Sequence, residues 1–126
     1  MQEITIHGKR IRTNNNQLQD VMQLWNEILP MNLQGDLYAV YYNFASNYLG
    51  DYDLIIGAKE APLSDQVTLF SGDYIEIPVE NNDIVNMGKA WETIWANAQI
   101  EAKRAYKTDY EKYNKDGTIS IFLSIK

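Results

Sequence analysis

The sequence predicts an α+β fold in which a strand–helix–strand–strand unit occurs twice and all strands form one antiparallel sheet. Residues 4–8 and 67–72 each form a strand pattern that leads through polar residues into a helix pattern. Each of these helices carries a Trp-x-x-Ile sequence, and a Tyr-x-x-Tyr strand follows each helix, at 38–41 and 110–113. We therefore predict two half-sheets related by a pseudo-twofold axis, with a cleft at the seam between them.

The first half begins with a strand at residues 2–13, where apolar and polar side chains alternate, and Gly8 is expected to break it at a bulge. The asparagines at 14–16 are expected to cap the next helix, because a short polar side chain can accept hydrogen bonds from its first free N–H groups. Apolar residues then recur at helical spacing as far as Pro30. Two further strands are predicted at 37–44 and 52–59, with a turn-rich loop at 45–50 between them.

The second half repeats this order. Residues 67–79 are predicted to form a long strand that breaks at Ser71-Gly72, and 81–83 are predicted to cap the second helix. A charged connection at 100–108 follows that helix. The last two strands, predicted at 110–114 and 118–125, form a hairpin because Asp116-Gly117 is a strong turn signal.

The length of 126 residues fits a single domain spanning 1–126, with half-repeats at approximately 1–61 and 62–126. The net charge of −6 at pH 7 argues against direct binding to nucleic acid and favours cationic ligands. No segment approaches the roughly 18 consecutive apolar residues of a membrane helix, and the N-terminus lacks a signal-peptide pattern. We therefore expect a cytoplasmic protein with no membrane partner.

The sequence lacks the residues of the common catalytic and metal sites. His7 is the single histidine and there is no cysteine, which argues against metal centres and thiol chemistry. Phosphate-binding and dinucleotide-binding glycine motifs are absent, and so is the G-x-S-x-G motif. We predict no metal, no cofactor and no catalytic residues, and thus a protein that is not an enzyme.

One carboxylate stands out, on the strand predicted around 109–113. Because strand side chains alternate, Glu111 and Tyr113 share one face. If that face is the inner one, the carboxylate needs hydrogen bonds from tyrosine hydroxyls or a cationic ligand. The alternative is that Glu111 faces water, and Trp91 has a similar alternative as a residue of the helix core.

At these residues the chain resembles the GyrI-like effector-binding domains, which serve as ligand sensors in AraC-type and MerR-type multidrug transcription regulators. The resemblance is carried by the order and spacing of the segments 38–44, 50–58, 72–74, 90–95 and 109–113. Residues 12–15 and the helix with Leu24-Trp25 look closest to the stand-alone integron-cassette branch of that family.

The resemblance implies a cleft between the two halves in which Glu111 contacts cationic, lipophilic ligands. It further implies that a tryptophan of the second helix and aromatic residues of the first-half strand and loop line this cleft. The expected ligand-binding residues are Glu111, Trp91, Tyr42, Phe44, Tyr48, Tyr52 and Tyr113. The chain has no room for a helix-turn-helix domain, so we expect it to act alone, with a fragment of a longer regulator as the alternative.

Three functions remain open on this basis. The first is a non-enzymatic small-molecule binding protein that senses or sequesters cationic amphipathic compounds. The second is a hydrolase of reactive small molecules, as in some relatives that resemble this fold, with Glu111 as the general base. The third is a protein-interaction module with a protein partner, as in gyrase-inhibitory relatives.

The two halves differ at the residue that carries the charge. Aligning Tyr38-x-x-Tyr41 with Tyr110-x-x-Tyr113 matches Ala39 with Glu111. The repeat therefore predicts a symmetric cleft in which only the second half supplies a carboxylate.

Overall fold

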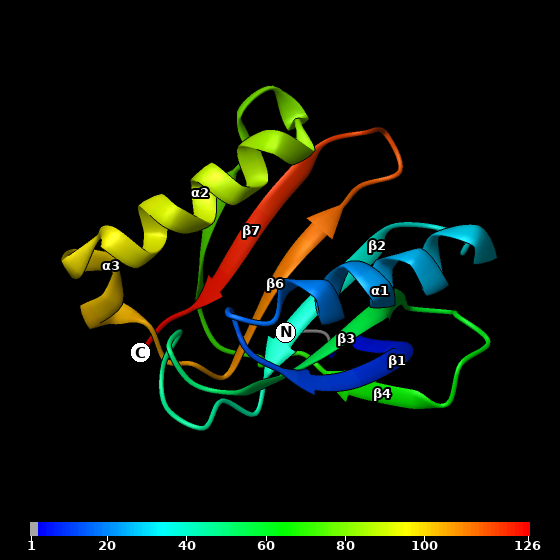
Figure 1. Ribbon diagram of the computed structural model, residues 1–126, viewed down its shortest axis with the longest axis horizontal. Coiled ribbons are helices and arrows are strands. Elements are labelled where there is room, and N and C mark those ends of the chain that lie inside the picture. Colours follow the sequence, from blue (N-terminus) through cyan, green and yellow to red (C-terminus); the bar gives the residue numbers. More distant parts are fainter. Residues whose placement is uncertain (1–2) are drawn as a thin grey trace.

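A seven-stranded antiparallel sheet organises residues 3–126, the part of the chain that the computed structural model describes (Figure 1). Its strand order is β4-β1-β3-β2-β6-β7-β5, which confirms the predicted α+β class. The strands are β1 (Thr5–Thr13), β2 (Leu37–Tyr42), β3 (Tyr52–Ala58), β4 (Asp65–Thr68), β5 (Tyr74–Pro78), β6 (Thr108–Tyr113) and β7 (Ile119–Ser124).

The sheet is symmetric about the contact between β2 and β6. Apart from β4, the order β1-β3-β2 on one side of this contact corresponds to β5-β7-β6 on the other. In the register, Ala39 pairs with Glu111, and the flanking pairs are Tyr38 with Lys112 and Val40 with Tyr110. The repeat matches residues 38–40 with 110–112, so the pair Tyr38–Lys112 in one half corresponds to the pair Tyr110–Val40 in the other. The pair Ala39–Glu111 corresponds to itself. The pseudo-twofold axis therefore passes through the Ala39–Glu111 pair.

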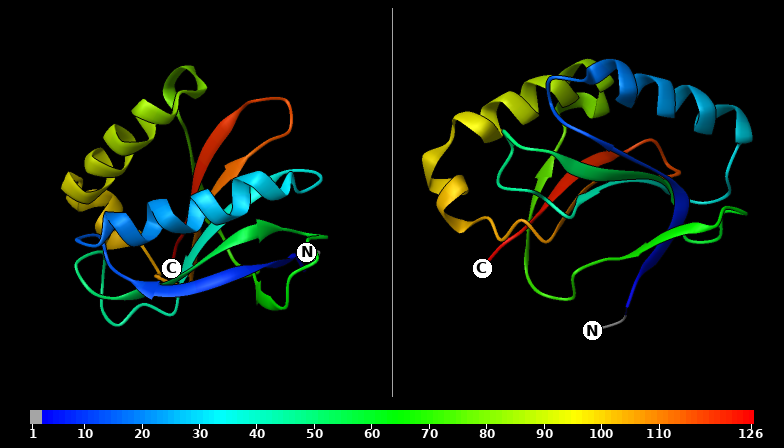
Figure 2. Two further views of the ribbon diagram at one scale, coloured as in Figure 1. Left: turned by 45° about the vertical axis from the view of Figure 1, so that its right-hand side comes forward. Right: turned by 60° about the horizontal axis from the view of Figure 1, so that its bottom comes forward.

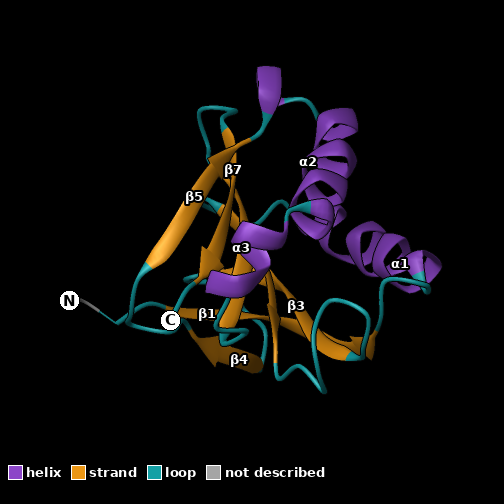
Figure 3. Cartoon of the chain, turned by 90° about the vertical axis from the view of Figure 1, so that its left-hand side faces the viewer, coloured by secondary structure: helices purple, strands orange, loops and turns teal. Residues whose placement is uncertain are grey.

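The two long helices cover the same face of the sheet (Figures 2 and 3). They are α1 (Leu18–Ile28) and α2 (Ile84–Ala96), accompanied by α3 (Ala98–Lys103) and the short 3₁₀ helices η1 (Leu29–Met31) and η2 (Glu80–Asn82). Leu24 and Ile28 of α1 pack with Leu54 and Ile56 of β3, and α2 packs in the same way on β7. None of the helices within residues 3–126 has the length and apolar composition of a membrane-spanning segment.

The opposite face of the sheet is covered by the chain that connects the two halves. Its core includes Ile6, Tyr38, Val40 and Tyr110, all of which are buried. The segment after β4 crosses beneath this face, where Phe70 N–H donates to the hydroxyl of Thr108 over 2.8 Å. Both faces of β3 are thereby enclosed, and every residue of that strand is buried.

This crossing corrects the prediction of one broken strand at 67–79. The structure places β4 beside β1 at one edge of the sheet and β5 beside β7 at the other edge. At Ser71-Gly72 the chain therefore passes from one half-sheet to the other. Local alternation could not reveal this, because both pieces have strand character by themselves.

Three local predictions were also wrong. β1 runs through Gly8 without a bulge and pairs there with Gly57. The side chain of Asn14 accepts from Asn16 N–H, whereas α1 begins after Gln17 without a side-chain cap. The connection predicted at 100–108 contains most of α3, whose N-cap is the side chain of Asn97.

Other local predictions are confirmed. Asp83 caps α2, since its side chain accepts from Val85 N–H over 2.9 Å. The final hairpin turns at Gly117, which has a φ of +95° that favours glycine. These positions depend on neighbours in sequence, and for that reason the sequence alone was sufficient to predict them.

We expect Gly57→Ala to destabilise the fold by about 1–3 kcal/mol, the usual cost of overpacking a tight site. A methyl group at Gly57 would overlap the carbonyl oxygen of His7, and the neighbouring strand backbone cannot move aside as a flexible side chain can. Chemical denaturation would measure the loss. Gly88→Ala is the control: beyond its chain neighbours and the local helix backbone, no described atom lies within 4 Å of its added carbon, and the change should stabilise α2 by up to about 1 kcal/mol. Equal stabilities of the two variants would contradict the close approach of β1 and β3.

Candidate functional site

A pocket of about 730 Å³ lies on the helix-covered side of the central strands, with walls from α1, α2 and the loop after β2. This volume lies within the usual range for small-molecule sites, roughly 300–1,000 Å³. All three tryptophans of the chain contribute to its wall. Its aromatic lining consists of Trp25, Tyr41, Phe44, Tyr48, Tyr52, Trp91, Trp95 and Tyr113.

The carboxylate of Glu111 lies in this aromatic pocket and is only 4% exposed. Three side chains donate hydrogen bonds to it. Trp91 Nε1 and the Tyr41 hydroxyl donate to Oε2, over 2.7 and 3.0 Å, and the Tyr113 hydroxyl donates to Oε1 over 2.7 Å. The interpretation in which Glu111 faces water is therefore wrong, and tyrosine hydroxyls satisfy the carboxylate as expected.

Burial dominates the acid–base chemistry of this group. It raises the pKa of Glu111, and the hydrogen bonds from Tyr113, Trp91 and Tyr41 oppose that rise by favouring the ionised form. Burial, reinforced by the nearby carboxylate, also raises the pKa of Tyr41 and of Tyr113. It raises the pKa of Tyr52 to about 12. The tyrosines are thus protonated donors at neutral pH.

Glu111 has no cationic partner among residues 3–126. The ion pairs in this part of the chain lie elsewhere, and the pocket's own basic residue, Arg104, pairs with Asp109 over 2.6 Å. A further carboxylate, Glu92, lies at the pocket wall on an exposed position of α2. The pocket therefore combines apolar surface with negative charge.

The aromatic walls obey the same pseudo-twofold relation as the sheet. The rings of Trp25 and Tyr113 meet edge to face at 5.1 Å and 79°, and those of Trp91 and Tyr41 at 5.5 Å and 68°. The repeat matches Trp25 with Trp91 and Tyr41 with Tyr113, so these two contacts are equivalent. The cleft is symmetric in its rings, and Glu111 is the charge that breaks the symmetry.

The structure brings six of the seven predicted ligand-binding residues to this pocket: Glu111, Trp91, Phe44, Tyr48, Tyr52 and Tyr113. Tyr42 is the exception, because it points to the opposite face of the sheet and packs against the core there. Tyr41 takes its place. Alternation along β2 puts Tyr41 on the same face as Ala39, the partner of Glu111, and this signal would have identified it.

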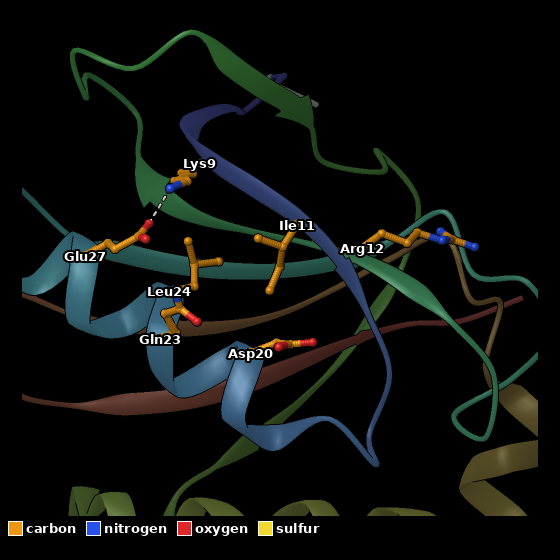
Figure 4. A pocket seen from close by; sticks show the side chains of 7 residues that line it. All are labelled: Lys9, Ile11, Arg12, Asp20, Gln23, Leu24 and Glu27. Atoms are coloured by element: carbon orange, nitrogen blue, oxygen red, sulfur yellow. Dashed lines mark hydrogen bonds and ion pairs between the residues drawn. The ribbon is translucent and has the colours of Figure 1, made fainter.

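A second hollow, of about 300 Å³, lies between α1 and β1 (Figure 4). Its charged side chains already have partners within the protein. Lys9 pairs with Glu27, and Arg12 donates to the carbonyl oxygen of Asn43 and contacts Asp53. The remaining charged side chain, Asp20, has no ion pair among the described residues and accepts a hydrogen bond from the Thr13 hydroxyl over 3.3 Å. The described residues also contain no group of three side chains suited to a metal ion.

Comparison with known proteins gives similarity to solved structures at the level of the fold. No protein-family model matches the chain, and no curated protein matches it. A solved structure of an integron cassette protein from the mobile metagenome of Vibrio cholerae matches with a TM-score of 0.72, at 23% identity. The match covers 100% of this chain and 92% of that one. The two proteins share a fold. The link to integron cassette proteins is thus supported at the level of the fold, whereas membership of the GyrI-like family stays a prediction.

Proposed function

We propose that this protein binds lipophilic aromatic cations in the pocket between α1 and α2, for sensing or sequestration, with Glu111 as the counter-charge. The observation that carries the proposal is a carboxylate that is 4% exposed, held by three hydrogen-bond donors in an aromatic pocket. Burying an ionised group is costly unless a partner of opposite charge compensates it. A ligand cation would be that partner.

The surrounding rings add a second source of attraction. A cation near the faces of Trp and Tyr gains about 0.5–2 kcal/mol per contact, and more when water is excluded. The apolar part of the ligand would be buried against residues of both helices, including Met22 and Met87. Methionine side chains adapt to irregular shapes, which favours a class of related ligands over one specific compound.

The net charge of the chain supports the same sign of ligand. A value of −6 at pH 7 attracts cations over long range, and Glu92 adds charge at the pocket itself. This contribution acts on the rate of association and falls with salt, whereas the effect of the buried carboxylate persists because salt screens buried charges less.

The direct test compares a charged ligand with its uncharged copy. The probes are 4-isopropenylbenzyltrimethylammonium and its isostere in which carbon replaces the nitrogen. Because all three tryptophans line the pocket, intrinsic fluorescence reports the binding of either one. We expect the cation to bind at least 10-fold more tightly, about 1.4 kcal/mol. Equal affinities, or binding of the neutral isostere alone, would rule out a cation site.

The affinity for this quaternary cation is expected to decrease as the pH falls. The probe has no titrating proton, so the loss reports protonation of Glu111, whose pKa burial raises above its ordinary value. The affinity for the cation should be at its maximum above the raised pKa of Glu111 and decline below it. The pH at which the decline begins should therefore lie above the ordinary glutamate pKa. Fluorescence titrations across a pH series would locate this pH. A pH-independent affinity extending below the ordinary glutamate pKa would contradict the assignment.

A hydrolase is the second candidate function, because a buried carboxylate with a raised pKa beside tyrosine hydroxyls is also suited to a general base. In that case Glu111→Gln would abolish turnover of an electrophilic substrate, such as an epoxide or an activated ester. Product formation by the wild type that the variant lacks would favour the hydrolase. A wild-type rate equal to the uncatalysed rate would favour the binding protein.

A further inference from the structure

A buried arginine lies at the same pocket as Glu111. Arg104 follows the last residue of α3, is 3% exposed and forms part of the pocket wall. Its Nη2 donates to Asp109 Oδ2 over 2.6 Å. Its Nε and Nη1 are buried without a hydrogen-bond partner among the described residues. Glu101 Oε1 lies 3.9 Å from Nη1, which is beyond hydrogen-bond distance.

The position of this arginine is firmly determined. Asp109 Oδ1 accepts from the backbone N–H and the hydroxyl of Ser124, over 2.8 and 3.0 Å. The ring of Tyr106 lies 4.1 Å from the guanidinium carbon. The arginine is thus held between an anchored carboxylate and an aromatic ring, while two of its nitrogens stay free to donate.

Strand β6 carries both Asp109, the partner of this arginine, and Glu111. Asp109 and Glu111 lie two residues apart on the same face of β6, which corresponds to about 7 Å along a strand. The wall of the pocket therefore contains a negative group at Glu111 and, in Arg104 beside Asp109, a buried guanidinium with unsatisfied N–H donors. Because Asp109 already neutralises the guanidinium, a neutral acceptor suits these donors better than a second carboxylate.

We propose that Arg104 is a second recognition point of the pocket and that its ligands are aromatic cations carrying a carbonyl oxygen, such as a ketone, ester or amide. The cationic group lies at Glu111 and the carbonyl oxygen accepts from the guanidinium. This inference rests on the proposed function and adds the class of ligand. Unpaired buried donors are costly, and an acceptor on the ligand recovers that cost on binding.

The test uses two cations of the same shape. 4-Acetylbenzyltrimethylammonium carries a carbonyl oxygen where 4-isopropenylbenzyltrimethylammonium carries a methylene carbon. We expect the acetyl compound to bind the wild-type protein about 10-fold more tightly, at the low end of the effect of a hydrogen bond to a charged group. Tryptophan fluorescence measures both affinities.

The protein variants locate this preference. Removing Arg104 alone would leave the charge of Asp109 buried and threaten folding, so the variant is Arg104→Met combined with Asp109→Asn, which keeps an oxygen for Ser124. The ratio of the two affinities should fall to about 1 in this variant. Lys103→Gln is the control, because it removes a neighbouring exposed charge, and it should keep the wild-type ratio.

Each outcome is decisive. Two cations that bind the wild type with equal affinity would overturn the role of Arg104 and leave the cation site intact. A preference that survives in the double variant would overturn it as well. If the double variant does not fold, equal affinities of the two cations for the wild type would still overturn the role of Arg104. Failure of both cations to bind would contradict the proposed function, and this inference with it.

Discussion

Glu111→Gln is expected to weaken the binding of aromatic cations at least 30-fold while making the empty protein more stable. Removing one partner of a buried charge pair costs about 2–5 kcal/mol of binding free energy, and the lower limit corresponds to about 30-fold. Glutamine has nearly the same shape and can still accept from Trp91 and Tyr41. Its neutral side chain avoids the cost of burying an ionised group.

The gain in stability should depend on pH. Because the folded-state pKa of Glu111 is raised, ionisation disfavours the folded state, and the wild type loses stability as the pH rises through that pKa. The variant should therefore be more stable at neutral pH, by about 0.5–2 kcal/mol, and the difference should vanish below the ordinary glutamate pKa. Urea denaturation of the wild type and the variant, at neutral pH and below the ordinary glutamate pKa, measures this difference in the free energy of unfolding.

The matched control is Glu92→Gln, which removes a carboxylate of the same pocket from an exposed position. Exposed charges contribute about 1 kcal/mol or less, so its cation affinity should fall by only a few-fold, and the difference from the wild type should disappear at high salt. A similar loss in both variants would mean that the overall field, and not the buried group, attracts the cation. A less stable Glu111→Gln would contradict the stability argument.

Ala39→Glu is expected to destabilise the protein by about 3–5 kcal/mol, the usual range for an uncompensated buried charge. Ala39 is fully buried and pairs directly with Glu111, so the new carboxylate would meet the existing one across the sheet. Two carboxylates on directly paired residues cannot both ionise readily, because their negative charges repel each other. Thermal or urea denaturation measures the loss.

The same substitution should be tolerated when Glu111 is changed to Ala in the same chain. In this double variant the carboxylate lies at position 39, which is equivalent to position 111 by the pseudo-twofold symmetry. We expect Tyr41 and Tyr113 to exchange their roles as donors, and Trp25 to donate in place of Trp91. We expect most of the stability to return and cation affinity to recover to within about 10-fold of the wild type. Glu111→Ala alone is the control. A double variant that binds no better than this control would contradict the symmetry of the site.

The prediction of the site from the sequence depended on what alternation can and cannot reveal. It placed Glu111 and Tyr113 on one face of a strand, and the structure confirms this placement. It also requires Tyr41 and Tyr42 to face opposite sides, but it does not say which side the helices cover. Alternation alone therefore did not choose between them, and Tyr42 was wrongly assigned to the pocket in place of Tyr41. The match of Tyr41 with Tyr113 in the repeat was the additional signal that selects Tyr41.

Arg104 was missed for a related reason. In the sequence it lies in a short charged segment that resembles a solvent-exposed connection. Its burial follows from α3 and from the ion pair with Asp109, neither of which has a distinct sequence pattern. The Asn97 side chain that caps α3 was the available signal, since a helix cap marks where the connection becomes helical.

The sequence by itself determined the strand–helix–strand–strand repeat, which side chains share a face of a strand or helix, and the single carboxylate by which the two halves differ. These follow from periodicity and from turn and cap residues, which act between neighbours in the chain. Only the tertiary structure decided that Glu111 lies on the pseudo-twofold axis and is buried, with 4% of its surface exposed. Its burial requires β2 and α2 to meet β6, and the contact with Tyr41 joins residues 70 positions apart. Such contacts depend on how the halves pack together, and local patterns carry no record of that packing.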